Sequence, residues 1–323
     1  MKERTIRIIV LSVIFVLAIV VFSFLTNRGS VDMTADMSSA TLPTVSFQVA
    51  GREANMLVGH KRNMNPAAVR DTIAIYGESE KLEMKIHHDV DSVDSVSYEI
   101  YSLDGEEKLY QERIDKVKDT LKLKMGAKLA EGQEALLKLT LHCGETPLYY
   151  YTRVMKEQDY HVEECVNYIE ELHTNIFKKQ NDDAVKKVME SNAQGDNTTL
   201  QHVTIHSDLP HIMWGSLKPK LINELQYEIK EVKKAYTSVL LRYQVECTGD
   251  NNEKERYYVK EFFKVAYGTE RVYLLEYDRT MEEVFDTSNV TLSSKGVLLG
   301  IASENTAYKV NADGTIVAFV QAN

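Results

Sequence analysis

Hydrophobic and polar residues follow three different patterns along this chain, and each pattern predicts a different kind of structure. The first is an unbroken apolar run at residues 8–26, IIVLSVIFVLAIVVFSFLT, which contains no charge, glycine or proline. At about 1.5 Å per residue, a helix of this length reaches about 28 Å, close to a hydrocarbon core of roughly 30 Å. The run therefore predicts a transmembrane helix.

The flanks of this run predict its orientation. Three basic residues precede it, and only Arg28 follows it before Asp32. Since basic flanks stay in the cytoplasm, we expect a cytoplasmic N-terminus and an extracytoplasmic bulk, held at the cell membrane by one span. A cleaved signal peptide would have a shorter apolar run with a small-x-small site directly behind it. Thr26–Gly29 lacks such a site, so residues 1–28 are interpreted as a cytoplasmic stub and an uncleaved signal anchor.

Residues 29–42 are small and polar and predict a tether. The second pattern begins after this tether and has a period of two, which is typical of strands. The runs that alternate or are rich in β-formers are residues 44–49, 54–60, 73–77, 82–87, 96–103, 135–141 and 147–155. Asp104-Gly105 is a strong hairpin turn signal because both positions tolerate positive φ. Short strands at this spacing predict a β-sandwich over residues 43–157.

The third pattern begins after residue 158, where apolar residues recur every three or four positions. Residues 160–178 predict an amphipathic helix with Asp159 as its N-cap, and a shorter helix is expected to follow. Four long β runs come next, at about 223–233, 236–247, 256–267 and 270–279. Their short polar connections predict an antiparallel meander, so residues 158–285 read as an α+β domain.

Residues 286–323 form a last β segment with a turn at Asp313-Gly314. Short strands with glycine-containing turns are typical of one propeller blade, an array that needs several copies to bury its faces. Two interpretations stay open. The strands complete the preceding sheet, or they begin a further module that is truncated here, which is the preferred interpretation.

The charge balance restricts the partners. Four of the 38 basic residues and one of the 48 acidic residues precede residue 29, so the remainder carries a formal charge of about −13. Such a surface repels phosphate polymers, which argues against nucleic acid and against peripheral binding to anionic lipid. Other envelope proteins are the expected partners, and nothing in the sequence indicates an oligomeric state.

The three cysteines do not suggest a disulfide-stapled domain, which would contain many more. Cys143 and Cys247 fall in strand-like runs and could form one bridge. Cys165 lies on the apolar stripe of the first helix and reads as a small buried hydrophobe. Three core cysteines without a bridge are an equally good interpretation.

Candidate chemistry is sparse. The segment HVTIHSDLPH could in principle bring His206, Asp208 and His211 around a zinc ion, although histidines at a strand end are more often surface polar groups. No metal, cofactor or catalytic residue is therefore expected. The sequence contains no GxSxG, HExxH, glycine-rich phosphate loop or CxxC pattern.

Aromatic residues provide one further indication of binding. Tyr257, Tyr258, Phe262 and Phe263 place rings on both faces of one predicted strand. One face must be core, and the other could bind a sugar or a partner strand. The alternative, that both faces are covered, is preferred because lysines share the second face.

Three segments resemble large, uncharacterised single-span envelope proteins of anaerobic Gram-positive bacteria. They are MLVGHKRNMNPAAVRDTI (56–73), YYYTRVM (149–155) and GVLLGI with GTIVAFVQAN within 296–323. The resemblance implies the same single-span topology and a longer β-rich continuation. It implies no activity and no catalytic residues.

Together these patterns predict a membrane-anchored extracytoplasmic protein that binds or scaffolds other envelope components without catalysis. One alternative is an envelope glycan hydrolase whose site lies outside this chain. Another is an accessory or sensory subunit of a membrane complex.

Overall fold

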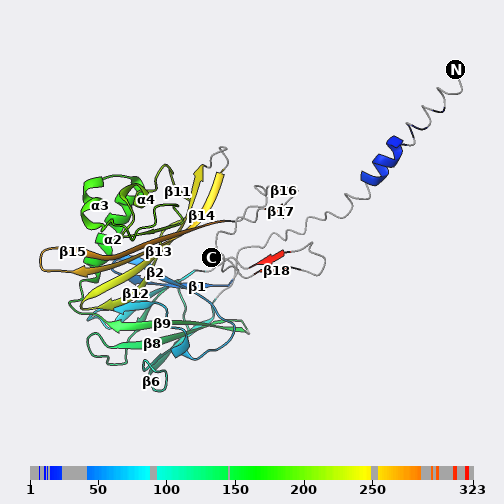
Figure 1. The fold of residues 1–323 in the computed structure, drawn as a ribbon. Helices are drawn as coiled ribbons and strands as arrows, with labels where there is room; N and C mark the ends of the chain where they lie inside the picture. The colour runs from blue at the N-terminus through cyan, green and yellow to red at the C-terminus, as the bar shows by residue number, and fades with distance from the viewer. Residues whose placement is uncertain are drawn as a thin grey trace. The chain divides into compact units, whose positions relative to one another are not determined.

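The computed structural model describes residues 42–87, 93–144, 146–248 and 254–284, together with parts of an N-terminal helix and four short strands between residues 292 and 319. Leu42–Asn323 make up one compact unit, and Met1–Thr41 make up another. The chain is β-rich, as its alternating pattern predicts. Figure 1 shows the helices grouped against one set of strands and β6, β8 and β9 gathered at the other end of the larger unit.

Two sheets pack face to face within residues 43–157. The first set of strands is β1 (Thr44–Val49), β2 (Arg52–Val58), β4 (Lys81–His87) and β7 (Thr120–Lys124). The second is β3 (Ile73–Tyr76), β9 (Thr146–Lys156), β8 (Glu134–Cys143), β5 (Ser95–Tyr101) and β6 (Lys108–Ile114), in that spatial order. Phe47 and Leu123 from the first and Leu139 from the second are fully buried in one core. The predicted sandwich-like pairing of sheets is therefore present.

Strands β6 and β7 have no counterpart among the predicted strands. Both are edge strands, and β6 is exposed along most of its length. The exposure of β6 accounts for its weak alternation, whereas β7 is only five residues long and alternates regularly, with Leu121 and Leu123 buried. Charged side chains such as Lys122 and Lys124 on β7 also keep other chains from pairing with that edge.

The predicted antiparallel meander is confirmed. Its strands are β12 (Gln226–Lys233), β13 (Tyr236–Thr248), β14 (Lys254–Tyr267) and β15 (Val272–Glu283), with β10 (His202–Thr204) beside β15 and β11 (Lys220–Leu221) beside β13. Alternate residues on β13 and β14, such as Tyr243 and Phe263, are buried. The remaining positions face the other side of the sheet.

The meander and the first sheet form one continuous ten-stranded sheet. β12 pairs in parallel with β2 at Tyr227 and Ala54, across the boundary expected after residue 157. A bulge in β2 then separates the two backbones, and the buried side chain of Asn55 bridges the gap. Its amide nitrogen donates to the carbonyl of Ile73 (2.8 Å), and its oxygen accepts from the N–H of Ile229 (2.7 Å).

Three helices cover the meander on one face. They are α2 (Val162–Lys178), α3 (Asp182–Val188) and α4 (Leu209–Ile212), and the short turn η1 (Pro66–Ala68) lies in the β2–β3 connection. The predicted N-cap at Asp159 is wrong. His161 occupies that position without a side-chain cap, because Asp159 (φ 58°) and His161 (φ 53°) both adopt left-handed backbone and delay the start of α2.

One face of the ten-stranded sheet is covered by described helices and by the five-stranded sheet, and no described helix or strand covers the opposite, open face. Arg52, Ala54 and Tyr227 lie on the covered side, since Arg52 and Tyr227 both contact Glu170 of α2. The five-stranded sheet covers the β1–β4 end of the same side. The opposite face carries mostly half-exposed side chains on the described strands, including Tyr258 and Lys260.

Two predictions lie partly outside the described residues. Among the residues that are described, no helix is long and apolar enough to cross a membrane, and residues 8–10, 12, 14 and 24–26 of the expected span are not among them. Residues 15–23 are described and are helical. In the segment 286–323, the described strands pair only as two ribbons, Leu292–Ser293 with Gly296–Val297 and Tyr308–Val310 with Val317–Phe319.

Candidate functional site

A groove crosses the open face of the ten-stranded sheet where β2, β12, β13 and β14 meet. It consists of two adjoining hollows of about 190 and 240 Å³, which share Asn223 and Gln226. The first hollow is lined by Ser46, Glu53 and Met56 from β1 and β2, and the second by Arg242, Gln244, Tyr258 and Lys260 from the meander. The strand alternation aims these side chains outward, because their neighbours in sequence fill the core.

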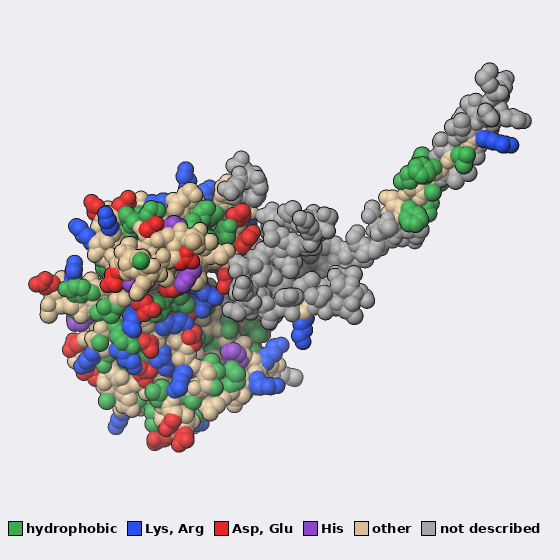
Figure 2. Space-filling model, in the orientation of Figure 1, with side chains coloured by type: hydrophobic (Ala, Val, Ile, Leu, Met, Phe, Trp, Pro, Cys, Tyr) green, Lys and Arg blue, Asp and Glu red, His purple; other side chains and the backbone are tan. Residues whose placement is uncertain are grey.

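The groove contains charges of both signs, and two of its charged side chains, Arg242 and Glu53, are held in ion pairs. Arg242 lies 2.5 Å from Glu228, and Glu53 pairs with Lys85 (3.0 Å) and His87 (2.7 Å). Burial alone would raise the pKa of Glu53, but hydrogen bonds from Lys85 and Ser46 hold it below its usual value. The carboxylate is therefore ionised. Figure 2 shows the same mixture of acidic and basic side chains over the face of the molecule in view.

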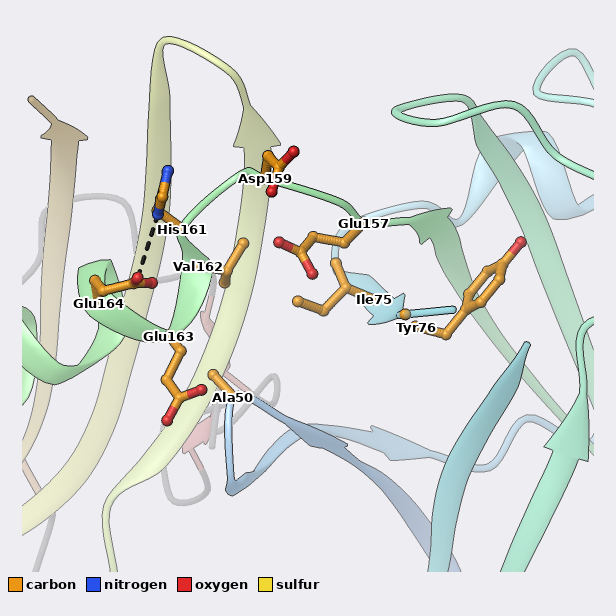
Figure 3. A pocket seen from close by; sticks show the side chains of 10 residues that line it. Ala50, Ile75, Tyr76, Glu157, Asp159, His161, Val162, Glu163 and Glu164 are labelled. Carbon is orange, nitrogen blue, oxygen red and sulfur yellow. Dashed lines mark hydrogen bonds and ion pairs between the residues drawn. The ribbon is translucent and has the colours of Figure 1, made fainter. Parts of the chain in front are cut away.

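An acidic pocket of about 470 Å³ lies on the covered side, between β3 and the first turn of α2. Figure 3 shows Glu157 and Asp159 on the connection that leaves β9, and Glu163 on the first turn of α2, around one space. His161 lies 3.2 Å from Glu164 and stacks on the ring of Tyr267 at 3.8 Å.

This acidic pocket suits a cationic group rather than a resident metal. Glu163 has no ion pair with a basic residue in the described part of the chain, and Glu157 accepts only the N–H of Tyr160. The pKa of Glu164 is lowered by a backbone N–H at the helix start and by His161. Within residues 42–284, as far as they are described, no three acidic, histidine or cysteine side chains are arranged to hold a metal ion.

The structure does not gather the three residues considered for zinc. Asp208 caps α4, and its Oδ1 lies 2.6 Å from Nδ1 of His211. His206 turns instead toward Asn192 (2.9 Å) and the carbonyl of Glu190 (3.1 Å). These contacts explain all three side chains without a metal.

A buried polar cluster joins α2 to the meander behind the open face. Glu261 is fully buried and accepts hydrogen bonds from His173 (2.6 Å), Tyr277 (2.7 Å) and Tyr243 (3.0 Å). Burial alone would raise the pKa of Glu261, but His173 and the charge of Arg279 keep it below its usual value.

Arg279 extends this cluster to α4. Its guanidinium donates to the carbonyls of Ile212 and His211 (2.8 Å each) and lies 4.1 Å from the ring of Trp214. Both side chains are fully buried. The cluster fixes the helices on the sheet, and its side chains are buried from solvent.

Two of the three cysteines, Cys165 and Cys247, are core residues, and Cys143 is partly buried. Cys165 is buried on the apolar stripe of α2, as predicted, and burial raises its pKa to about 11. Cys247 is also buried and is a free thiol, so the Cys143–Cys247 bridge is not formed.

The preferred interpretation, in which both faces of β14 are covered, does not hold among the described residues, although the shared face was predicted. The alternation predicted that Tyr258 and Lys260 share one face of β14, and these residues line the second hollow. Glu53 and Met56, which line the first hollow, lie about 200 positions before Tyr258 and Lys260 in the chain, and no local pattern connects the two pairs.

Searches against protein families, curated proteins and solved structures found no match for this chain.

Proposed function

We propose that this protein is a membrane-anchored extracytoplasmic binding protein that holds a segment of another envelope protein in the groove of its open sheet face. The single observation that carries this proposal is the groove itself. It lies on the uncovered side of the longest sheet and is lined by amide, aromatic and charged side chains of both signs.

The lining favours a polypeptide over other ligands. Asn223, Gln226 and Gln244 can each donate and accept, so they match the N–H and C=O groups of an extended backbone. Hollows of about 190 and 240 Å³ fall below the roughly 300–1,000 Å³ of most small-molecule sites. They are large enough for individual side chains of a bound segment.

The anchor rests on the N-terminal run. Residues 15–23 are helical, and apolar side chains on that helix are exposed, Phe15 at 67% and Val20 at 58%. Burying such side chains in lipid is favourable by about 25 cal/mol per Å². The basic N-terminal flank supports an extracytoplasmic position for Leu42–Asn323, and the resemblance to single-span envelope proteins suggests the same topology.

Site-specific photocrosslinking in intact cells tests the proposal. A crosslinker at Gln226, in the groove, is expected to capture one envelope protein repeatedly, whereas one at exposed Lys187 on α3 is the matched control. The captured protein, once purified, should bind the full chain, and Gln226→Arg with Gln244→Arg should weaken that binding about tenfold or more by filling the groove.

The proposal is wrong if Gln226 and Lys187 capture the same set of proteins. Release of reducing sugar from purified cell wall by the full chain would instead support the hydrolase. The topology is tested separately, since a reporter active only in the cytoplasm must be inactive when fused after Ser30.

A further inference from the structure

The long β2–β3 connection, residues 59–72, is an ordered loop that presents two adjacent cations. His60 pairs with Tyr149 of β9 through two backbone hydrogen bonds of 2.9 Å, and Met64 donates its N–H to the Tyr151 hydroxyl (2.7 Å). Lys61 and Arg62 lie between these two attachments and are exposed. The loop therefore holds both side chains out from a fixed backbone.

These cations have no acidic partner in the described part of the chain. The acidic side chains nearby already have partners. Glu99 pairs with Lys108 and Lys138, and Asp71 pairs with Lys230. Among the described residues, Lys61 and Arg62 therefore form a basic pair without acidic partners, on a protein whose formal net charge is −10.

The acidic pocket is the complementary feature at the other end of the same strand. His60 is paired near the start of β9, at Tyr149, whereas Glu157 directly follows the last residue of β9. Eight residues of strand separate the two, which is about 26 Å at 3.3 Å per residue. A lysine side chain cannot span that distance, so the loop cannot occupy the pocket of its own copy.

We propose that Lys61 and Arg62 of one copy bind in the acidic pocket of a second copy, so that the chain associates head to tail. The pocket volume of about 470 Å³ accommodates two long side chains. Glu157 and Glu163 supply carboxylates without cationic partners, whereas Lys234, the basic residue facing Asp159, is paired with Glu131 at 3.1 Å. Because the two surfaces differ, the contact is heterologous and can propagate along a membrane.

The association is weak and depends on tethering. An exposed ion pair strengthens binding by about fivefold at most, so two pairs alone do not hold a dimer in dilute solution. Copies anchored in one bilayer meet at a much higher effective concentration. The high effective concentration rests on the proposed anchor, whereas the pairing of the basic loop with the acidic pocket does not depend on the groove.

The test uses the full chain in phosphatidylcholine vesicles, as an equal mixture of ¹⁵N-labelled and unlabelled copies. Flotation first checks that the protein is integrated, and failure there counts against the anchor alone. A photocrosslinker at Asn63 is then expected to join peptides of different isotopic label, with the second site inside residues 157–164. Crosslinks that land elsewhere, or that join only peptides of the same label, overturn the inference.

Charge variants sharpen the result. Lys61→Glu with Arg62→Glu removes the basic point. Glu157→Gln with Glu163→Lys removes the pocket charge, while the side-chain oxygen at position 157 still accepts from the N–H of Tyr160. Each variant by itself should reduce the yield of the mixed-label crosslink about tenfold or more. A mixture of the two variant proteins should restore it, because the loop variant keeps an intact pocket and the pocket variant keeps an intact loop.

Lys186→Glu with Lys187→Glu on α3 is the matched control and should crosslink like the unmodified chain. Failure of the mixture of the two charge variants to recover the crosslink would refute head-to-tail pairing.

Discussion

Replacing Glu261 by glutamine should loosen the helices from the sheet. The carboxylate is fully buried and accepts from His173, Tyr243 and Tyr277, while Arg279 contributes opposite charge. Removing one member of a buried charged cluster costs about 3 to 5 kcal/mol, and glutamine keeps one acceptor oxygen, so we expect about 3 kcal/mol. That is a large share of the roughly 5 to 15 kcal/mol that stabilises a folded protein.

The assay uses the single tryptophan. Trp214 is fully buried and stacks on Arg279, so its fluorescence reports packing at this cluster. In urea, with a slope of about 3 kcal/mol per M, the unfolding midpoint of Glu261→Gln should fall by about 1 M. Glu276→Gln, at an exposed position on the neighbouring strand β15, should leave the midpoint unchanged.

The same variant tests the pH dependence. Because the pKa of Glu261 is lower in the folded protein, its ionisation adds stability above the unfolded value, and that contribution is lost as the pH falls through the folded value. The unmodified chain should therefore lose more stability than Glu261→Gln on acidification below about pH 4.5. Equal midpoints at neutral pH, together with equal acid sensitivity, would refute the role assigned to this cluster.

Two further predictions concern Asn55, which bridges β2 and β12, and the buried thiols of Cys165 and Cys247. Asn55→Ala leaves the Ile73 carbonyl and the Ile229 N–H without their partner, so the free energy of unfolding measured in urea should fall by about 3 kcal/mol. Asn55→Gly loses the same hydrogen bonds but tolerates the φ of 55° at this position, so comparing the two variants separates the lost hydrogen bonds from backbone strain. An equal midpoint for Asn55→Ala and the unmodified chain would show that this bridge contributes nothing. Cys165 and Cys247 should react with a thiol reagent only on unfolding, since both are buried with pKa values of about 11, and rapid labelling of the native protein detected by mass spectrometry would contradict that burial.

Local periodicity was sufficient to identify most elements of the larger unit. The helix at 160–178, the meander strands and the shared face of Tyr258 and Lys260 all follow from spacing along a continuous segment. The spacing of apolar residues shows which face of a helix or strand is buried against a neighbouring layer, and this spacing can be read from the residues of that element alone. Edge strand β6 buries little on either face, so its pattern is weak, whereas β7 alternates clearly over only five residues and was overlooked.

Tertiary structure alone decided what lies between segments that are distant in sequence. The pairing of Ala54 with Tyr227, the bridge made by Asn55 and the first hollow of the groove all join regions about 170 residues apart. The first residue of α2 could not be predicted from the sequence either. Asp159 is a good N-cap by residue type, but its left-handed backbone moves the N-cap to His161. A sequence pattern records how much of a side chain is buried, whereas it holds no information on which distant chain segment does the burying.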